Sequence, residues 1–226
     1  MGAEKPLAVV LLSGGMDSCV TAAIARETHR VALLHASYVQ RTEKRERQAF
    51  AAIADFWGIP DRLMVRLDHL AKVGGSALTD PNIPVPPGSL DSSEVPVTYV
   101  TFRNAHLLAV AVSWAEVSGA GAVFIGAVHG DSSAYPDCRP EFFAKFAELI
   151  RLGTKPGTRI AMHTPVIGMR KSEIIRRGIA LGAPLHLTWS CYQNEEKACG
   201  GCASCLLRLR AFAEAGQVDP IPYQMR

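Results

Sequence analysis

The stretch Leu7-Ala8-Val9-Val10-Leu11-Leu12-Ser13-Gly14-Gly15-Met16-Asp17-Ser18 carries the strongest signal in this chain of 226 residues. Its apolar half is bounded by a glycine pair, which predicts a buried strand that ends in a tight turn. Residues 19–28, rich in Ala, Ile and Arg, predict a helix directly after the turn. A strand, a glycine turn and a helix in this order aim free backbone N–H groups and a helix N-terminus at one point, which is the geometry of a phosphate-binding loop.

The side chains of this loop fit phosphate chemistry. Gly14 and Gly15 let the backbone approach a ligand closely, and the hydroxyls of Ser13 and Ser18 add donors. Asp17 would repel a phosphate, so its place in the loop indicates a Mg²⁺ ion between the two. A helix that is merely capped after a turn is the minor alternative. The loop has neither the Gly-Lys-Ser/Thr ending of a Walker A motif nor the Gly-x-Gly-x-x-Gly pattern of dinucleotide-binding folds.

The loop resembles the pyrophosphate-binding loop of the PP-loop ATP pyrophosphatases. Those enzymes cleave ATP between its α and β phosphates, transfer the nucleoside monophosphate to an oxygen, and hold the departing pyrophosphate in this loop. The resemblance implies a fold of the adenine nucleotide alpha hydrolase type and ATP bound with Mg²⁺. The residues that it places around ATP are Leu12, Ser13, Gly14, Gly15, Met16, Asp17, Ser18, Cys19, Val20, Leu34 and His35.

Length and composition predict one large α/β domain with a small addition. A hydrophobic content of 48% is enough for a real core, and a net charge of +3 is too small to indicate a nucleic-acid partner. The chain shows no signal-peptide pattern and no apolar run near the ~20 residues that span a bilayer. We therefore expect a cytoplasmic protein that binds small molecules and neither nucleic acid nor membrane.

Apolar segments alternate with helical segments, which predicts parallel strands joined by right-handed crossovers. The predicted fold class is α/β with a doubly wound parallel sheet, and its ligand should lie at the carboxyl ends of the strands. We expect strands at 7–12, 30–38, 63–67, 122–127 and 159–164, and helices at 19–28, 43–58, 104–118, 141–152 and 170–181. The basic run within 41–47 is interpreted as a solvated helix face.

Residues 74–96 break this pattern with five prolines among Gly, Ser and Asp. A loop of this length inside a compact domain is usually functional or disordered. Two interpretations remain open: a lid over the nucleotide site, and a surface excursion without a role.

Four cysteines near the C-terminus follow the pattern C-x7-C-x2-C-x2-C, and they are Cys191, Cys199, Cys202 and Cys205. Four thiolates complete a tetrahedral Zn²⁺ site, which leaves no open position and is therefore structural. An iron–sulfur cluster is the alternative. Cys19 and Cys138 are interpreted as small buried hydrophobes. We divide the chain into a nucleotide-binding domain, 1–187, and a zinc-binding segment, 188–226.

A longer set of strings narrows the substrate. The cysteine cluster is embedded in Thr188-Trp189-Ser190-Cys191-Tyr192 and Ala198-Cys199-Gly200-Gly201-Cys202, and upstream lie Tyr99-Val100-Thr101-Phe102-Arg103-Asn104 and Tyr135-Pro136-Asp137-Cys138-Arg139. Together with the loop, they resemble the 7-cyano-7-deazaguanine synthase family of queuosine biosynthesis. The resemblance implies a carbon–nitrogen ligase that turns 7-carboxy-7-deazaguanine, ATP and ammonia into a nitrile. It also implies a homodimer, and ammonia that is free or comes from a separate donor.

Residue roles follow from this resemblance. Asp17, Lys171 and Arg103 are the candidate catalytic residues, with Lys171 and Arg103 stabilising anionic groups. A solvated lysine at a helix end is the alternative for Lys171. The candidate contacts to the deazapurine are Arg103, Asn104, Asp131, Tyr135, Asp137 and Arg139. The carboxylates of Asp131 and Asp137 would accept hydrogen bonds from the guanine-like edge or, alternatively, cap a loop. Tyr135 would stack on the purine or pack in the core.

Three other functions stay open at this point. The first is another PP-loop adenylating enzyme, either a tRNA-thiolating enzyme or an amide synthetase. The second is an enzyme of the same chemistry that acts on a protein acceptor. The third, from a different class, is a zinc-knuckle module that binds nucleic acid, although the weak charge argues against it.

Overall fold

A computed structural model describes residues 4–88, 94–129 and 135–224 of this chain. Five parallel strands form one sheet in the order β3-β2-β1-β4-β5. The chain runs from β1 outward to β3 on one side and then returns to β4 and β5 on the other. The topological switch point of the sheet therefore lies between β1 and β4, where a doubly wound fold opens its ligand crevice. The strands are β1 (Leu7–Leu11), β2 (Arg30–Ser37), β3 (Arg62–Arg66), β4 (Ala122–Ile125) and β5 (Ala161–His163).

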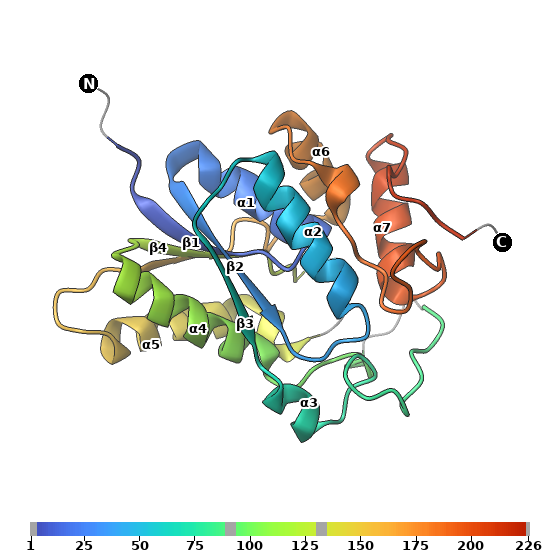
Figure 1. Cartoon of the computed structure of the whole chain (residues 1–226), viewed down its shortest axis with the longest axis horizontal. Coiled ribbons are helices and arrows are strands. Elements are labelled where there is room, and N and C mark those ends of the chain that lie inside the picture. Colours follow the sequence, from blue (N-terminus) through green and yellow to red (C-terminus); the bar gives the residue numbers. More distant parts are fainter. Residues whose placement is uncertain (1–3, 89–93, 130–134, 225–226) are drawn as a thin grey trace.

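Helices cover both faces of the sheet (Figure 1). One layer holds α1, α2 and α6, and the other holds α4 and α5, while α7 packs against α6 near the C-terminus. The helices are α1 (Met16–Thr28), α2 (Glu43–Phe56), α3 (His69–Val73), α4 (Arg103–Ser118), α5 (Pro140–Gly153), α6 (Lys171–Ala180) and α7 (Ala203–Glu214), with single turns η1 (Pro136–Cys138) and η2 (Leu185–Leu187).

Alternate residues of β1 supply the two cores. Val10 packs with Phe50 and Ile53 of α2 on one face, and Val9 packs with Leu108 of α4 on the other. Because both faces are covered, the strand reads as an unbroken apolar run rather than an alternating one. The expected α/β fold with a parallel sheet is confirmed.

The predicted strands and helices are present within a few residues of the expected ends. Helix α1 begins three residues earlier than expected, at Met16, because Gly15 serves as its N-cap in an extended conformation. Two helices were not predicted: the short α3, and α7, which begins between two of the cysteines.

Gly126, directly after β4, lets the end of that strand touch the first turn of α1. A Cβ atom at this position would lie 2.9 Å from the backbone carbon and oxygen of Asp17 and from Cα of Ser18. Such a distance is shorter than any normal carbon contact, so the backbone of α1 would have to move. The close approach of β4 to α1 fixes the position of the helix N-terminus at the switch point.

We expect Gly126→Ala to destabilise the protein by about 1–3 kcal/mol, the usual cost of overpacking, and to lower Tm by roughly 2–12 °C. Thermal unfolding followed by circular dichroism measures this effect. Gly153→Ala is the matched control, because a Cβ there meets nothing within 4 Å. Equal melting temperatures for the two variants would contradict the argument.

Candidate functional site

The glycine turn after β1 is held by its own side chains. The hydroxyls of Ser13 and Ser18 lie 3.0 Å apart, the Gly15 N–H donates to Ser13 Oγ at 3.2 Å, and Ser18 Oγ donates to the Gly15 carbonyl at 2.9 Å. Gly14 has a φ of +90°, and a Cβ there would lie 2.7 Å from the Glu46 carbonyl. The turn is therefore an ordered cradle at the N-terminus of α1, as the sequence predicted.

Asp17 and Lys171 meet across this cradle. Lys171 Nζ donates to Asp17 Oδ2 at 2.7 Å, from the first residue of α6 to the first turn of α1. Both side chains are mostly buried, with exposed fractions of 12% for Lys171 and 25% for Asp17. The second oxygen of Asp17, Oδ1, is buried and has no hydrogen-bond partner. A buried carboxylate oxygen without a partner fits a divalent cation, which prefers oxygen ligands.

A cavity of about 290 Å³ opens next to this pair at the carboxyl ends of β1, β2 and β4. Its wall includes eleven of the predicted site residues: Leu12, Ser13, Gly15, Met16, Asp17, Ser18, Leu34, Arg103, Asn104, Tyr135 and Lys171. Residues that are far apart in the sequence therefore converge on one site at the switch point.

Arg103 brings a positive charge to the far side of the cavity. Its Nη1 donates to the Tyr38 hydroxyl at 3.0 Å, and its Nε is buried without a partner. Burial acts to lower the pKa of Arg103, but the oxygens of Tyr38, Tyr135 and Asp137 hold that pKa above its ordinary value. A guanidinium with an unused N–H in a cavity wall is suited to bind a carboxylate or a carbonyl oxygen.

Asp137 lies in the cap of α4 rather than in the cavity wall. Its Oδ2 accepts the Asn104 N–H at 2.9 Å, and Asn104 Nδ2 donates to the Asp137 carbonyl at 2.9 Å. Of the two interpretations offered for Asp137, the geometry matches the cap. This cap orients Arg103, which is the first residue of the helix.

Five more predicted residues do not line the cavity. Gly14 faces α2, while Cys19 and Val20 lie in the core between α1 and its neighbours. His35 is buried behind the first strand, where its Nδ1 lies 3.2 Å from the Leu12 carbonyl, and burial lowers its pKa. Arg139 is exposed at the start of α5.

Asp131, a further predicted deazapurine contact, lies outside the described residues. Tyr135 is described and stands in the cavity wall, where its hydroxyl lies 2.9 Å from Thr98 Oγ1. Its ring centroid is 5.4 Å from that of Tyr99, so packing and stacking on a ligand are both compatible with its position.

Cys138 is a wall residue whose thiol stays protonated. Burial, reinforced by the neighbouring Asp137, raises the pKa of Cys138 to about 11. Its Sγ accepts a hydrogen bond from Asn104 Nδ2 at 3.4 Å. A neutral thiol of this kind packs and does not act as a nucleophile.

Glu46, Gln40 and Thr42 were missed by the sequence reasoning, yet they line the cavity together. Thr42 and Glu46 lie within the run 41–47, whose basic residues are interpreted as a solvated helix face, and Gln40 directly precedes that run. A signal was available: only a few residues separate the end of β2 from the start of α2. The first turn of α2 must therefore sit at the ligand end of the sheet. Arg45, in the same run, covers the ring of Trp189 at 4.7 Å.

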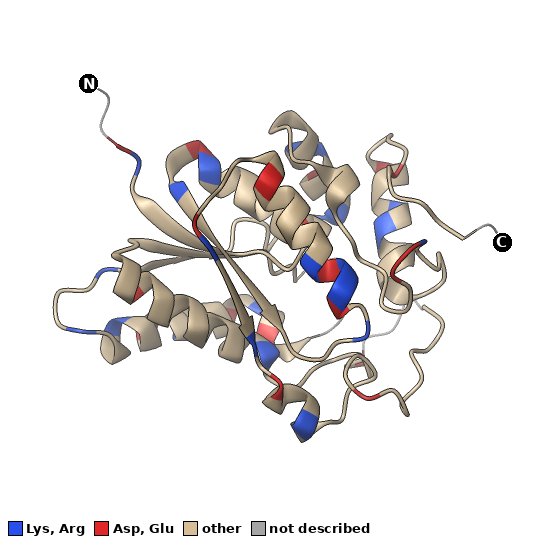
Figure 2. Cartoon of the chain, viewed as in Figure 1, with Lys and Arg blue, Asp and Glu red and all other residues tan. Residues whose placement is uncertain are grey.

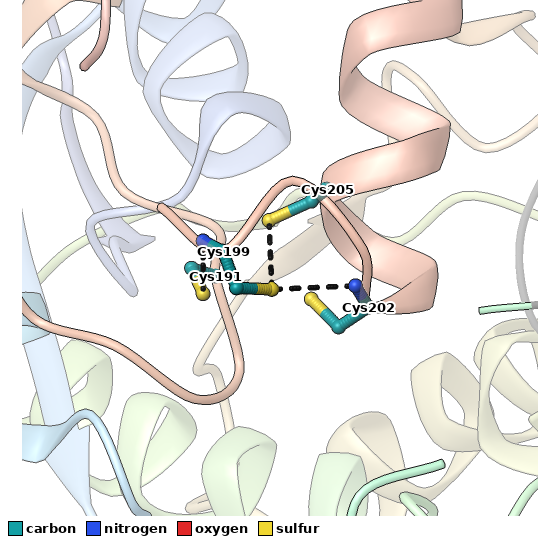
Figure 3. A group of neighbouring side chains, drawn as sticks. All are labelled: Cys191, Cys199, Cys202 and Cys205. Carbon is teal, nitrogen blue, oxygen red and sulfur yellow. Dashed lines mark hydrogen bonds between the residues drawn. The ribbon is translucent and has the colours of Figure 1, made fainter. Parts of the chain in front are cut away.

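The four clustered cysteines converge on one point between the segment before α7 and its first turn (Figure 3). Their sulfur atoms all lie within 4.8 Å of one another, and Cys199 Sγ is 3.9 Å from Cys205 Sγ. A tetrahedron with metal–sulfur bonds of about 2.3 Å has edges of about 3.8 Å. Backbone N–H groups of Gln193, Asn194, Gly201 and Cys202 point at the sulfurs, as they do around thiolates. The donor set fits a closed structural metal site.

The segment around this cluster also forms part of the cavity wall. Trp189 donates its backbone N–H to the Gly14 carbonyl at 2.8 Å, and Ser190 and Tyr192 line the cavity. Trp189 itself is 2% exposed. The cysteine segment therefore closes one side of the glycine turn and of the cavity next to it.

Arg208 anchors α7 to this segment. It is 2% exposed, as is its partner Asp219, and the two side chains make a bidentate pair at 2.7 and 2.9 Å. Arg208 also donates to Thr188 Oγ1 at 2.7 Å, and Tyr223 donates to Asp219 at 2.6 Å. Every charge in this group has a partner, which is the condition for a buried ion pair to be tolerated.

Residues 74–88 of the proline-rich loop are tied down at both ends. Arg41 donates to the carbonyls of Ala77, Asp80, Pro81 and Ile83. Gly88 donates its N–H to the Gly201 carbonyl at 2.9 Å, directly beside the cysteine cluster. Leu78 of this loop lines the cavity. The loop is therefore a docked part of the site's surroundings, and whether it opens and closes stays a prediction.

The surface carries both signs of charge. Figure 2 shows Lys and Arg interspersed with Asp and Glu along the described ribbon, with both signs on the first turn of α2. In the part of the chain that the structure describes, the helices are too short or too polar to cross a bilayer.

Fold and site together define a nucleotide-binding α/β protein of the PP-loop type. The model of the family described as "Queuosine biosynthesis protein QueC" matches residues 7–216, and the chain belongs to that family.

Three curated relatives extend over nearly the whole chain, and each is named 7-cyano-7-deazaguanine synthase. The relative from Koribacter versatilis is 59% identical and covers 97% of this chain and 94% of its own length. The relative from Chloroherpeton thalassium is 57% identical, with 97% of both chains covered. The relative from Acidobacterium capsulatum is 55% identical over the full length of both.

We expect Asp219→Ala to lower the free energy of unfolding by about 3–5 kcal/mol, because it leaves the buried Arg208 guanidinium without its carboxylate. Urea unfolding followed by Trp fluorescence measures the change. The control is Glu214→Ala, which removes an exposed partner 3.7 Å from Arg210 and should cost less than about 0.5 kcal/mol. A loss below 1 kcal/mol for Asp219→Ala would mean that the pair does not anchor α7.

Proposed function

We propose that this protein is an ATP-dependent ligase that converts 7-carboxy-7-deazaguanine and ammonia into 7-cyano-7-deazaguanine. The observation that carries the proposal is the 55–59% identity, over almost the full chain, to relatives with that name. The geometry supports it, because the cradle, the Asp17–Lys171 pair and Arg103 surround one cavity.

The reaction needs two activations. A carboxylate is a poor electrophile, because its oxygen does not leave. Transfer of AMP from ATP to that oxygen releases pyrophosphate and creates a phosphate leaving group. Attack by ammonia displaces AMP and gives the amide. A second ATP activates the amide oxygen in the same way, and loss of AMP and a proton leaves the nitrile. Such chemistry depends mainly on positioning and on stabilisation of charge on phosphate.

The chain's residues have distinct roles in this proposal. The N–H groups at the start of α1 and the hydroxyls of Ser13 and Ser18 bind the β and γ phosphates. Lys171 stabilises charge on the α phosphate during attack, and the Arg103 guanidinium binds the acid. Asp17 would hold Mg²⁺ through Oδ1, and the ion would neutralise phosphate charge when bound.

The further proposals concern the protein as a whole. The cysteine site is a Zn²⁺ site, one per chain, because the reaction needs no redox centre and four thiolates close a zinc tetrahedron. Residues 1–187 form the nucleotide-binding domain, and 188–226 form the zinc-binding segment. The protein acts in the cytoplasm on free ammonia or ammonia from a donor, as a homodimer and without nucleic acid.

We expect Asp17→Asn to reduce turnover by more than about 100-fold, because an amide is a weaker cation ligand and the phosphates lose their counterion. The assay is pyrophosphate release with MgATP, ammonium and the deazapurine acid, with the nitrile identified by mass spectrometry. Glu27→Gln is the control, since it removes a carboxylate from the same helix at an exposed pair with Arg177. Near-normal turnover in Asp17→Asn would refute the role of the loop, and pyrophosphate release without nitrile would favour another PP-loop ligase.

We expect purified protein to contain one zinc per chain by elemental analysis, with no visible absorbance from iron–sulfur charge transfer. Cys202→Ala should lose that zinc and lower Tm, because metal binding contributes directly to folding of such segments. Cys19→Ala is the control, since Cys19 is buried in the sheet core away from the cluster. Iron in the place of zinc, or full zinc content in Cys202→Ala, would contradict the assignment.

A further inference from the structure

Glu46 occupies a central place in the cavity that the roles above do not use. It lies in the first turn of α2, and its backbone carbonyl packs against Gly14 of the phosphate cradle. Its side chain lines the same cavity as Arg103, Tyr38 and Tyr135. Glu46 therefore shares the cavity with the glycine turn on one side and with the aromatic residues on the other. In the proposed function, the ring of the acid would lie next to these aromatic residues while its carboxylate is activated at the turn.

Two neutral donors hold the carboxylate in a fixed orientation. Thr42 Oγ1 donates to Oε1 at 2.8 Å, and Gln40 Nε2 donates to Oε2 at 3.0 Å. Gln40 is itself fixed, because its Oε1 accepts the Tyr38 N–H at 2.8 Å. Each carboxylate oxygen thus accepts one hydrogen bond from the protein and keeps a second lone pair that can accept another. Among the ion pairs of the described residues, none includes Glu46.

The remaining acceptor positions match a particular ligand edge. The pyrimidine ring of a 7-deazaguanine carries a ring N–H beside an exocyclic amino group, which are two donors side by side. A carboxylate accepts such a pair in bidentate fashion with charge-assisted hydrogen bonds. Adenine presents one donor and one acceptor on the corresponding edge, so a carboxylate would leave the adenine acceptor facing a negative charge.

Asp137, which the sequence offered for this contact, does not line the cavity: its Oδ2 is engaged in the cap of α4, and its Oδ1 is buried without a hydrogen-bond partner. Glu46 is half-buried with its two oxygens already oriented by Gln40 and Thr42. Burial raises the pKa of its carboxyl, while those two hydrogen bonds and the positive charge of Arg103 act to lower that pKa and favour the carboxylate. These observations favour a Glu46 carboxylate that binds uncharged N–H donors of a ligand rather than a positively charged ligand group.

We infer that Glu46, oriented by Gln40 and Thr42, is the residue that recognises the 2-amino and ring N–H edge of the deazapurine acid and distinguishes it from adenine. This inference rests on the proposed function and names the part of the site that selects its substrate. Gln40 and Thr42 are positioning residues that act through Glu46.

The test measures binding and requires no turnover. Isothermal titration follows the acid, and its analogue without the 2-amino group, binding to protein that holds Mg²⁺ and an ATP analogue with a methylene bridge between the α and β phosphates. The wild type should bind the acid about 10- to 100-fold more tightly than the analogue, the range for a hydrogen bond to a charged group. Glu46→Gln should weaken binding of the acid to the level of the analogue and leave the affinity for the nucleotide unchanged.

Two further variants complete the design. Glu43→Gln removes a carboxylate from the same helix turn, where it pairs with Arg66 at the surface, and should change neither affinity. Thr42→Val keeps the Glu46 carboxylate but removes one orienting donor, and should weaken binding of the acid by less than Glu46→Gln. Circular dichroism checks that each variant is folded, and if Glu46→Gln is not, the wild-type preference and Thr42→Val decide the question.

The possible failures are distinct. Equal binding of the acid and the analogue to the wild type, or unchanged acid affinity in folded Glu46→Gln, would overturn the inference and leave the proposed function intact. A variant that loses only nucleotide affinity would assign Glu46 to ATP instead. A wild type that binds neither compound would refute the proposed function, and the inference would fall with it.

Discussion

The close approach of separate backbones around the glycine turn is the constraint on which the rest of the site depends. Helix α1 meets the end of β4 at Gly126, α2 meets the turn at Gly14, and the segment before the cysteines meets it through the bond from Trp189 to Gly14. In the first two contacts a side chain larger than hydrogen would force backbone apart. The cradle is therefore rigid because its neighbours have almost no freedom to move, which is the condition for electrostatic preorganisation.

Much of this architecture was accessible from the sequence. The strands, the parallel sheet and the glycine turn before α1 follow from local patterns, since an apolar run before two glycines has few other structures. The place of the cavity followed from a topological rule, because the carboxyl ends of parallel strands share one edge, whereas Asp17, Lys171 and Arg103 were assigned to it by the family resemblance. The four cysteines were recognisable from spacing alone, since short intervals bring thiols to one ion.

The rest depends on tertiary contacts that no local pattern encodes. Glu46 lies in a charged run typical of a solvated helix, and its place in the cavity wall follows from where α2 begins on the sheet rather than from the composition of the run. Arg41 belongs to the same basic run, yet its guanidinium donates hydrogen bonds to backbone carbonyls about 40 positions later in the chain. Helix α7 was not predicted, because Cys202 and Cys205 at its start were interpreted only as metal ligands. His35 was expected at the ligand because it lies near the end of β2, but it does not line the cavity, and its ring packs against that of Phe50 of α2 with the centroids 5.2 Å apart.

The division into a nucleotide-binding domain, 1–187, and a zinc-binding segment, 188–226, suggests two separate parts, but the cysteine segment contributes to the site of the first part. Trp189, Ser190 and Tyr192 form part of the cavity wall next to the glycine turn, and Gly88 ties the proline-rich loop to Gly201. In engineering terms, truncation before this segment would not yield a minimal catalytic unit. It would remove part of the cavity wall and leave the glycine turn open to bulk water on one side.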